Sequence, residues 1–242
     1  MESSLALQQS YWTRWNEETR ERRLTEVSFD QQRLVIDWLS RLDRTDLDIL
    51  EVGCGAGWLC PSMKPFGRVT ATDLSAAVVD RAAKRIPDVR FVSGDFMGLD
   101  FAIEGYDVVV SLEVLSHVAD HSAFVGKVAS LLRPGGVFIL ATQNRPVLER
   151  YNKVPPPQPG QLRRWFDRRE LVDLLTPFVD VRELHVLTPI ANRGVPRLVA
   201  NRYVKRAMRA ASGRLYDRVL TGMGLGWTLM LRAEKKSGQA SP

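Results

Sequence analysis

Short apolar runs and segments with helical periodicity alternate along the middle of the chain. Runs rich in Val, Ile and Leu predict strands at 48–53, 68–73, 89–93, 106–112 and 137–142. Segments between them predict helices at 58–64, 75–85 and 122–132. Because the predicted strands lack regular polar alternation, the pattern indicates an α/β fold whose parallel sheet is covered by helices on both faces.

Both ends of the chain depart from this alternation. Residues 5–24 and 29–42 predict helices ahead of the first strand. After the fifth strand, the pattern predicts a helix at 168–175, a strand at 179–187, a long basic segment and a final strand at 226–233. We therefore expect an N-terminal helical unit over 1–44 and one domain over 45–242, with insertions at about 145–167 and 190–225.

The composition fits a cytoplasmic globular protein. The chain has 242 residues, and 45% of them are hydrophobic, which is ample for a core. No apolar run is long enough to cross a bilayer, and the N-terminus lacks the pattern of a signal peptide. The only cysteines, Cys54 and Cys60, have no metal-ligand companions and are expected to be reduced, buried thiols.

Charge is distributed unevenly along the chain. Residues 1–144 carry 15 Lys and Arg against 20 Asp and Glu, a net charge of −5, whereas residues 145–242 carry 19 against 8, a net charge of +11. This asymmetry predicts that the second part faces an anionic partner, such as a phosphate-bearing, carboxylate-bearing or lipid-linked acceptor.

The basic segment at 196–220 is predicted to be an amphipathic helix. Its apolar stripe consists of Ala200, Val204, Ala207, Met208, Ala211 and Leu215. Its basic residues mostly fall elsewhere on the helix, namely Arg202, Lys205, Arg206 and Arg209. Two alternatives stay open: the stripe packs on the domain and leaves a solvated basic face, or the segment binds an anionic substrate or makes peripheral contact with a membrane.

Three glycines at every second position end the first predicted strand, in the stretch LDILEVGCGAG. Glycines at the carboxyl end of a parallel strand allow a tight turn and close approach of a ligand to the backbone. The dinucleotide fingerprint G-x-G-x-x-G requires its last glycine at position 58, where this chain has Trp58. A dinucleotide site is therefore disfavoured. No Gly-Lys-Ser/Thr follows either, so a P-loop is excluded.

The stretch ILEVGCGAG resembles the first motif of class I S-adenosylmethionine-dependent methyltransferases. Later landmarks follow in that family's order, namely VTATDLS, VRFVSGDFM, YDVVVSLEVLSHVAD and LLRPGGVFILATQN, so that the resemblance covers about 45–190. It implies a Rossmann-like, seven-stranded, mostly parallel sheet whose last strand is antiparallel. It also implies an enzyme of class EC 2.1.1.-, similar to ubiquinone O-methyltransferases and to natural-product and sugar methyltransferases, which converts S-adenosylmethionine to S-adenosylhomocysteine.

The resemblance assigns a set of cofactor-binding residues. They are Glu51, Gly53, Gly55, Gly57, Asp73, Leu74, Asp95, Phe96 and Leu112. Asp73 ends the second strand, where a carboxylate accepts hydrogen bonds from both ribose hydroxyls; its alternative role is to cap the helix that starts at Ser75. Asp95, beside apolar Phe96, is expected to hold the adenine amino group, with an ordinary loop carboxylate as the alternative.

His117 leaves the fourth strand at the sheet edge where the transferred methyl group is expected. A hydroxyl acceptor is a weak nucleophile, and histidine is the side chain best suited to take its proton near neutral pH. We predict His117 as the catalytic base, with substrate positioning and a structural role as the alternatives. No His, Asp or Glu set has metal-ligand spacing, so no metal is expected.

Other residues are expected to contact the acceptor. In related enzymes an N-terminal helix closes over the site, so 1–44 is predicted to be a lid that contributes Tyr11 and Trp15; an ordinary packing helix is the alternative. The insertion after the fifth strand is expected to add Asn144, Arg145, Tyr151 and Trp165.

The leading hypothesis is methyl transfer to a small molecule, with oxygen preferred over nitrogen as the acceptor atom. A small amine is the first alternative. RNA is disfavoured because no recognisable RNA-binding module and no cysteine pair for attack on a base are present. A protein that binds the cofactor without catalysis is the last alternative.

Overall fold

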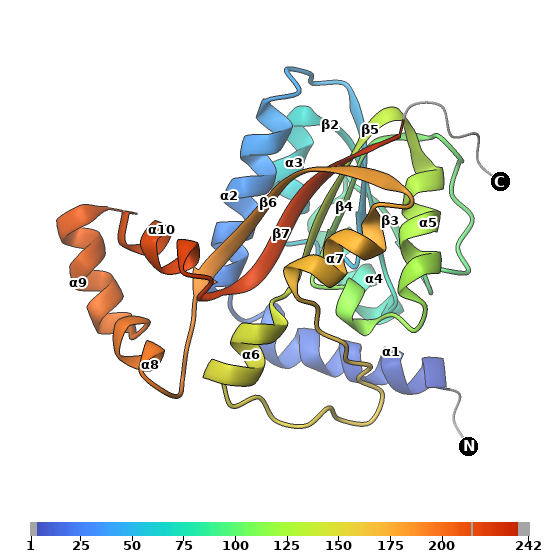
Figure 1. Cartoon of the computed structure of the whole chain (residues 1–242). Helices are drawn as coiled ribbons and strands as arrows, with labels where there is room; N and C mark the ends of the chain where they lie inside the picture. The colour runs from blue at the N-terminus through green and yellow to red at the C-terminus, as the bar shows by residue number, and fades with distance from the viewer. Residues whose placement is uncertain (1–3, 214, 237–242) are drawn as a thin grey trace.

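One sheet of seven strands forms the centre of the computed structural model, which describes residues 4–213 and 215–236 (Figure 1). The strands are β1 (Leu47–Val52), β2 (Gly67–Asp73), β3 (Arg90–Ser93), β4 (Tyr106–Leu112), β5 (Leu132–Gln143), β6 (Val179–Pro189) and β7 (Gly226–Lys235). Their order is β3-β2-β1-β4-β5-β7-β6, and β7 runs antiparallel to both of its neighbours. The predicted Rossmann-like sheet with an antiparallel last strand is confirmed.

Helices cover both faces of this sheet. Before β4 lie α1 (Ser4–Trp15), the π-helical turn η1 (Asn16–Arg20), α2 (Glu26–Ser40), α3 (Cys60–Met63), the 3₁₀ turn η2 (Lys64–Phe66) and α4 (Ala76–Arg85). After β4 lie the 3₁₀ turn η3 (Leu115–His117), α5 (His121–Leu131), α6 (Arg145–Tyr151), α7 (Arg168–Leu175), α8 (Pro196–Val199), α9 (Arg202–Ser212) and α10 (Leu215–Gly222).

Side chains of each central strand alternate between two apolar layers. In β1, Leu50 and Val52 pack with the layer that includes α5 and α7, whereas Leu47 and Ile49 pack with the layer that includes α2 and α3. Because both layers are apolar, the strands read as nearly continuous hydrophobic runs. Cys54 and Cys60 are free and buried in the second layer, as predicted.

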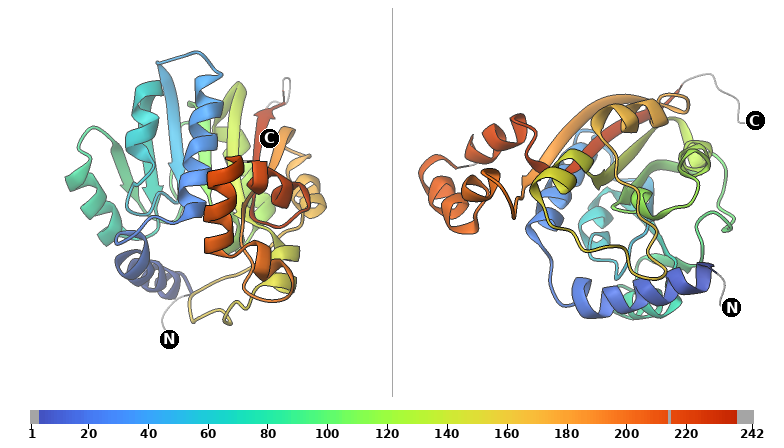
Figure 2. Two further views of the ribbon diagram at one scale, coloured as in Figure 1. Left: turned by 90° about the vertical axis from the view of Figure 1, so that its left-hand side faces the viewer. Right: turned by 60° about the horizontal axis from the view of Figure 1, so that its bottom comes forward.

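The strand order reverses between β1 and β4, and the carboxyl ends of the parallel strands meet at one edge of the sheet. This edge is where α/β sheets bind ligands. Helix α1 runs across this open edge, and the segment after α6 runs beside it (Figure 2). The predicted sheet therefore positions a site under the N-terminal helix.

The terminal segments differ from their predicted helices. The helix expected at 5–24 is interrupted by η1, and α6 forms inside the insertion at 145–167. The helix expected at 196–220 is three helices, α8 to α10, because the chain bends at Ala200 and Gly213.

The first alternative for the basic segment is that its apolar stripe packs on the domain. Helix α9 instead turns this stripe toward solvent and part of its basic face toward the domain. Lys205 is 4% exposed, whereas Val204 and Met208 are each 38% exposed. The reason is Glu26 at the start of α2, which forms ion pairs with Lys205, at 2.7 Å between Nζ and Oε1, and with Arg209. The side chain of Arg202 lies outside the described residues.

Among the helices that the structure describes, none combines the length and the hydrophobicity that crossing a membrane would require.

Candidate active site

The glycine loop after β1 is held against β2. The backbone N–H groups of Gly53 and Cys54 donate to the Thr72 carbonyl, at 2.8 and 3.0 Å. Gly53 has φ +76°, and a Cβ there would lie 2.1 Å from Cγ2 of Val114. Gly55 has φ +51°, and a Cβ there would lie 2.7 Å from Oδ1 of Asn16. Both positions therefore require glycine for conformation and for space.

Asp73 organises this loop from the end of β2. Its Oδ2 accepts from the backbone N–H of Gly55 at 2.8 Å, and its Oδ1 accepts from that of Ser75 at 3.0 Å. Ser75 itself caps α4 by accepting from Val78, so the alternative role of Asp73 as that cap is wrong. Burial raises the pKa of Asp73 despite these hydrogen bonds. Each carboxylate oxygen keeps a lone pair for a further donor.

A cavity of about 930 Å³ opens at this edge of the sheet. Most of the predicted site residues line it, namely Glu51, Gly53, Gly55, Asp73, Leu74, Asp95, Phe96, Leu112, His117, Trp15 and Trp165. The structure thus brings together residues from β1, β2, β4, the loop after β3, the N-terminal helices and the insertion. Gly57 does not line the cavity; a Cβ there would lie 3.0 Å from the Phe91 ring, so it serves the packing behind the loop.

Two acids whose carboxyl groups are buried line the cavity. Glu51 accepts from the thiol of Cys60 at 3.1 Å, and burial raises the pKa of Glu51 to about 7. Glu113 follows β4 with φ +65°, which is uncommon outside glycine and marks a strained position. Its Oε1 accepts from Gln31 at 2.5 Å and from Thr228 at 3.2 Å, and burial raises its pKa.

Arg20 brings a cation close to these acids, and no sequence pattern distinguishes it from its charged neighbours. It ends the π-helical turn, and its guanidinium lies 5.4 Å from the ring of Trp15 and 5.5 Å from that of Trp58. Its Nη1 donates to Oγ of Ser28 at 2.5 Å. Burial lowers the pKa of Arg20, while Glu113 and Glu51 oppose that shift. Arg20 forms no salt bridge with any described carboxylate.

Four polar atoms of cavity-lining residues are buried without a hydrogen-bond partner. They are Oδ1 of Asn16, Oγ1 of Thr72, Oε2 of Glu113 and Oε1 of Gln143. An unpaired buried acceptor is costly, so such atoms indicate where a ligand supplies donors. Together with the cation of Arg20, they suit a ligand that carries both an anionic group and hydrogen-bond donors. The residues present therefore fit the amino-acid part of the cofactor expected from the sequence.

His117 lies in η3, directly after β4. Its Nδ1 is 2.6 Å from the carbonyl oxygen of Leu162, which can only accept, so Nδ1 carries the proton. Nε2 of the neutral ring is then a free proton acceptor. Burial lowers the pKa of His117, and the Trp12 ring lies 4.6 Å from the imidazole. The arrangement favours a neutral histidine that can take a proton.

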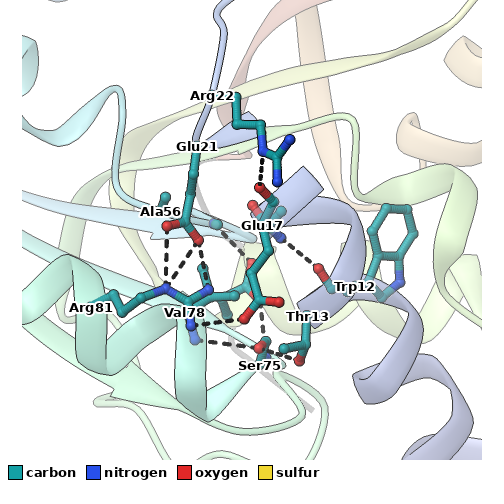
Figure 3. A network of polar contacts seen from close by, with 12 residues as sticks. Trp12, Thr13, Glu17, Glu21, Arg22, Ala56, Ser75, Val78 and Arg81 are labelled. Carbon is teal, nitrogen blue, oxygen red and sulfur yellow. Dashed lines mark hydrogen bonds and ion pairs between the residues drawn. The ribbon is translucent and has the colours of Figure 1, made fainter. Parts of the chain in front are cut away.

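Helix α1 and η1 are tied to α4 by a polar network (Figure 3). Oγ1 of Thr13 lies 2.6 Å from Oγ of Ser75, and Arg81 forms ion pairs with Glu17 at 3.0 Å and with Glu21 at 2.7 Å. Trp12, which is labelled beside this network, and Trp15 line the cavity from above. The network therefore holds Trp12 and Trp15 in position over the cavity.

Four of the predicted acceptor residues, Tyr11, Asn144, Arg145 and Tyr151, lie outside the cavity lining. Nδ2 of Asn144 donates to the Gly226 carbonyl at 2.8 Å and so joins α6 to β7. Arg145 pairs with Asp167 and Glu170. Tyr11 is buried against Trp12, and Tyr151 accepts backbone hydrogen bonds at the end of α6.

Other side chains take their place in the lining, namely Trp12, Gln143, Gln161, Arg163 and Trp227. Arg163 donates to Gln161 Oε1 at 2.9 Å and to the Pro155 carbonyl at 2.6 Å, and it lies 5.3 Å from the ring of Trp165. Only the aromatic character of Trp12 and Trp227 could have indicated these positions.

No group of three His, Cys, Asp or Glu side chains in the described ranges 4–213 and 215–236 could hold a metal ion.

The sheet order, the glycine loop and the carboxylate at the end of β2 are typical of Rossmann-like nucleotide-binding sites, and the sequence assigns the family. The chain belongs to the methyltransferase domain family, whose sequence profile matches residues 28–178. A ubiquinone biosynthesis O-methyltransferase of Rhodopseudomonas palustris is 35% identical over 109 residues, which cover 41% of each chain. The match thus spans about two fifths of that relative's length.

Solved structures share the fold at low sequence identity. A 1,6-didemethyltoxoflavin-N1-methyltransferase of Burkholderia thailandensis, crystallised with that substrate and S-adenosylhomocysteine, is 21% identical with a TM-score of 0.63 and covers 96% of this chain and 88% of its own. An S-adenosylmethionine-dependent methyltransferase of Mesorhizobium loti is 17% identical with a TM-score of 0.61 and covers 82% of this chain and 96% of its own.

Proposed function

We propose that this chain transfers the methyl group of S-adenosylmethionine to a hydroxyl oxygen of a small molecule. The observation that carries the proposal is the cavity itself. It combines a carboxylate at the end of β2 suited to a ribose, a partly buried cation without a salt bridge, unpartnered acceptors suited to an amino acid, and a neutral histidine. The name of the family supports methyl transfer, and the name of the O-methyltransferase relative supports oxygen as the acceptor atom. The Burkholderia thailandensis neighbour is named an N1-methyltransferase, so nitrogen is the alternative that the experiment below tests.

Each part of the cofactor has a group in this cavity that suits it. In this proposal Asp73 accepts from the two ribose hydroxyls, and Asp95 with Phe96 holds the adenine; all three residues line the cavity. We propose that Arg20, which also lines the cavity, binds the methionine carboxylate and that the unpartnered Oε2 of Glu113 accepts from the ammonium group. Opposite charges on the ligand would offset the buried charges of these two side chains.

The cofactor supplies an electrophilic methyl group on a positively charged sulfur, which leaves as a neutral thioether. The chain has to align the acceptor and to exclude water. Nε2 of His117 takes the proton of the acceptor hydroxyl, and the hydrogen bond from Nδ1 to Leu162 holds the ring and stabilises the resulting imidazolium. Trp12 and Trp15 cover the cavity, so we propose α1 as a lid.

The acceptor we propose is a hydroxylated ring or sugar. The ring of Trp12 lies 4.6 Å from the imidazole of His117, and Trp15, Trp165 and Trp227 line the same cavity. These side chains offer flat apolar surfaces for stacking. No RNA-sized surface is needed for such a substrate.

Formation of S-adenosylhomocysteine with a panel of catechols, quinols and sugars tests the proposal, with amines of similar shape alongside. We expect turnover of hydroxyl acceptors by the unmodified protein. His117→Ala should lower kcat by about 10²- to 10⁴-fold, because a general base contributes on that order, and should leave S-adenosylhomocysteine affinity unchanged.

His121→Ala is the matched control, since His121 does not line the cavity. If only amines are methylated, the acceptor atom is nitrogen and the proposal of an oxygen acceptor fails. Tight cofactor binding without any product across the panel would favour a binding protein over an enzyme.

A further inference from the structure

Helices α8 to α10 project from the domain as a separate lobe (Figures 1 and 2). The lobe, residues 191–225, is inserted between β6 and β7. Ile190, directly before it, and Trp227, two residues after it, both line the cavity. Nζ of Lys205 donates to the carbonyl of Pro189 at 3.1 Å and so ties α9 to the end of β6. The lobe therefore lies next to the candidate active site.

Exposed large apolar side chains are concentrated on this lobe. Eight of the thirteen such residues in the described part of the chain lie there, namely Val195, Leu198, Tyr203, Val204, Met208, Leu215, Val219 and Met223. Leu198, Leu215 and Met223 are exposed by 68%, 60% and 70%. Because Lys205 and Arg209 face Glu26, α9 presents its apolar stripe outward rather than burying it. Such clustering marks an interaction surface.

The lobe is also strongly basic. It holds eight Lys and Arg residues, and Asp217 is its only acid, for a net charge of +7. Asp217 pairs with Arg209. Arg197, Arg206 and Arg218 are exposed, and none of them forms a salt bridge among the described residues. Apolar and cationic groups are thus exposed on the same three helices.

We propose that this lobe docks the protein on an anionic lipid surface. Exposed Leu, Val and Met side chains would enter the boundary between headgroups and acyl chains, and the three arginines would bind lipid phosphates. Charge decides against a second copy of the chain, because a symmetric contact would place two lobes of +7 against each other. Docking would hold the mouth of the cavity near the lipid, which goes beyond the methyl transfer proposed above.

Flotation of the full chain with vesicles tests the proposal. Vesicles of neutral phosphatidylcholine are compared with vesicles in which about one third of the lipid is phosphatidylglycerol. We expect binding to the anionic vesicles, weaker binding at high salt, and little binding to the neutral ones. The triple variant Arg197→Gln, Arg206→Gln, Arg218→Gln should lower the partition coefficient by about two orders of magnitude, since each basic residue contributes about fivefold.

A second variant tests the apolar contribution. Leu198→Ser with Val219→Ser should weaken binding to anionic vesicles, whereas Ile103→Ser, an exposed apolar residue outside the lobe, should not. The matched charge control is Lys84→Gln, Arg90→Gln, Arg168→Gln, which removes the same charge from exposed positions outside the lobe. Far-UV circular dichroism verifies that every variant is folded.

Three outcomes would overturn the proposal. The first is the absence of binding to anionic vesicles, and the second is equal binding by lobe variants and their controls. The third is a concentration-dependent dimer in light scattering that the Leu198 and Val219 changes abolish, because that would assign the surface to a second copy of the chain. None of these outcomes depends on methyl transfer.

Discussion

Arg20 is a partly buried cation that contacts two aromatic rings and a hydroxyl and forms no salt bridge with a described residue. If it binds the carboxylate of the cofactor, Arg20→Met should weaken S-adenosylhomocysteine binding by about 10- to 100-fold, the range for a lost charged hydrogen bond. Adenosine, which lacks the amino acid, should bind both proteins equally. Calorimetry with the two ligands measures this difference.

Arg22→Met is the control, because Arg22 is exposed two residues further on. An equal loss of affinity for adenosine and for S-adenosylhomocysteine would mean that Arg20 only supports the fold of the cavity.

His117 makes a prediction about pH. A general base must be neutral, so kcat/KM should fall as the pH drops through the pKa of the folded enzyme. Burial lowers that pKa from the ordinary value of 6.5, so the acid limb should lie below pH 6.5. The residual kcat/KM of His117→Ala should not fall over this pH range. An acid limb that persists in this variant would assign the proton transfer to another group.

Most helices and strands of the central domain could be predicted from the apolar runs in the sequence. Residues 106–112 and 168–175 begin and end as predicted, and the remaining central strands differ by a few residues at their ends. The strands could be predicted because burial on two faces demands continuous apolar sequence, and the helix at 168–175 because its apolar residues recur at helical spacing. The glycine loop and Asp73 follow from the same pattern, since they must stand where strands end.

Elements that depend on distant contacts could not be predicted. The π-helical turn that carries Asn16 and Arg20 interrupts a segment with helical composition, and its i to i+5 bonding has no local signal. The positive φ of Glu113 is held by Gln31 and Thr228, which come from α2 and β7. Likewise, the outward stripe of α9 depends on Glu26, 179 residues from Lys205.

The tie between α4 and the N-terminal segment gives an element-scale prediction. Arg81→Met removes the ion pairs with Glu17 and Glu21, so α1 and η1 should open more often. We expect faster amide hydrogen exchange in 4–20 and about fivefold weaker S-adenosylhomocysteine binding, the range for roughly 1 kcal/mol from a surface pair. Lys64→Met, which breaks the exposed pair with Asp88, should change neither quantity.

At the scale of the whole molecule, the buried acids couple stability to pH. The folded-state pKa of Glu51 is about 7, above the ordinary 4.5, so the folded protein binds more protons than the unfolded chain between these values. The free energy of unfolding should therefore fall as the pH rises from about 5 to about 7. Glu51 alone contributes up to roughly 3 kcal/mol to this loss.

Urea unfolding at several pH values measures this slope. Glu51→Gln should flatten it, because an amide does not titrate, whereas Asp100→Asn removes an exposed carboxylate and should leave it unchanged. The same slope in Glu51→Gln and in the unmodified protein would show that Glu51 stays ionised in the folded state.

Tryptophan is distributed so that the intrinsic fluorescence of this protein reports mainly on one place. Five of its six tryptophans, Trp12, Trp15, Trp58, Trp165 and Trp227, line the cavity. The sixth, Trp38, is buried on α2, and its indole N–H donates to Glu183 at 3.2 Å. Unlabelled compounds can therefore be screened by quenching of emission, with Trp38 as a constant background, and the acceptor can be sought directly among natural extracts.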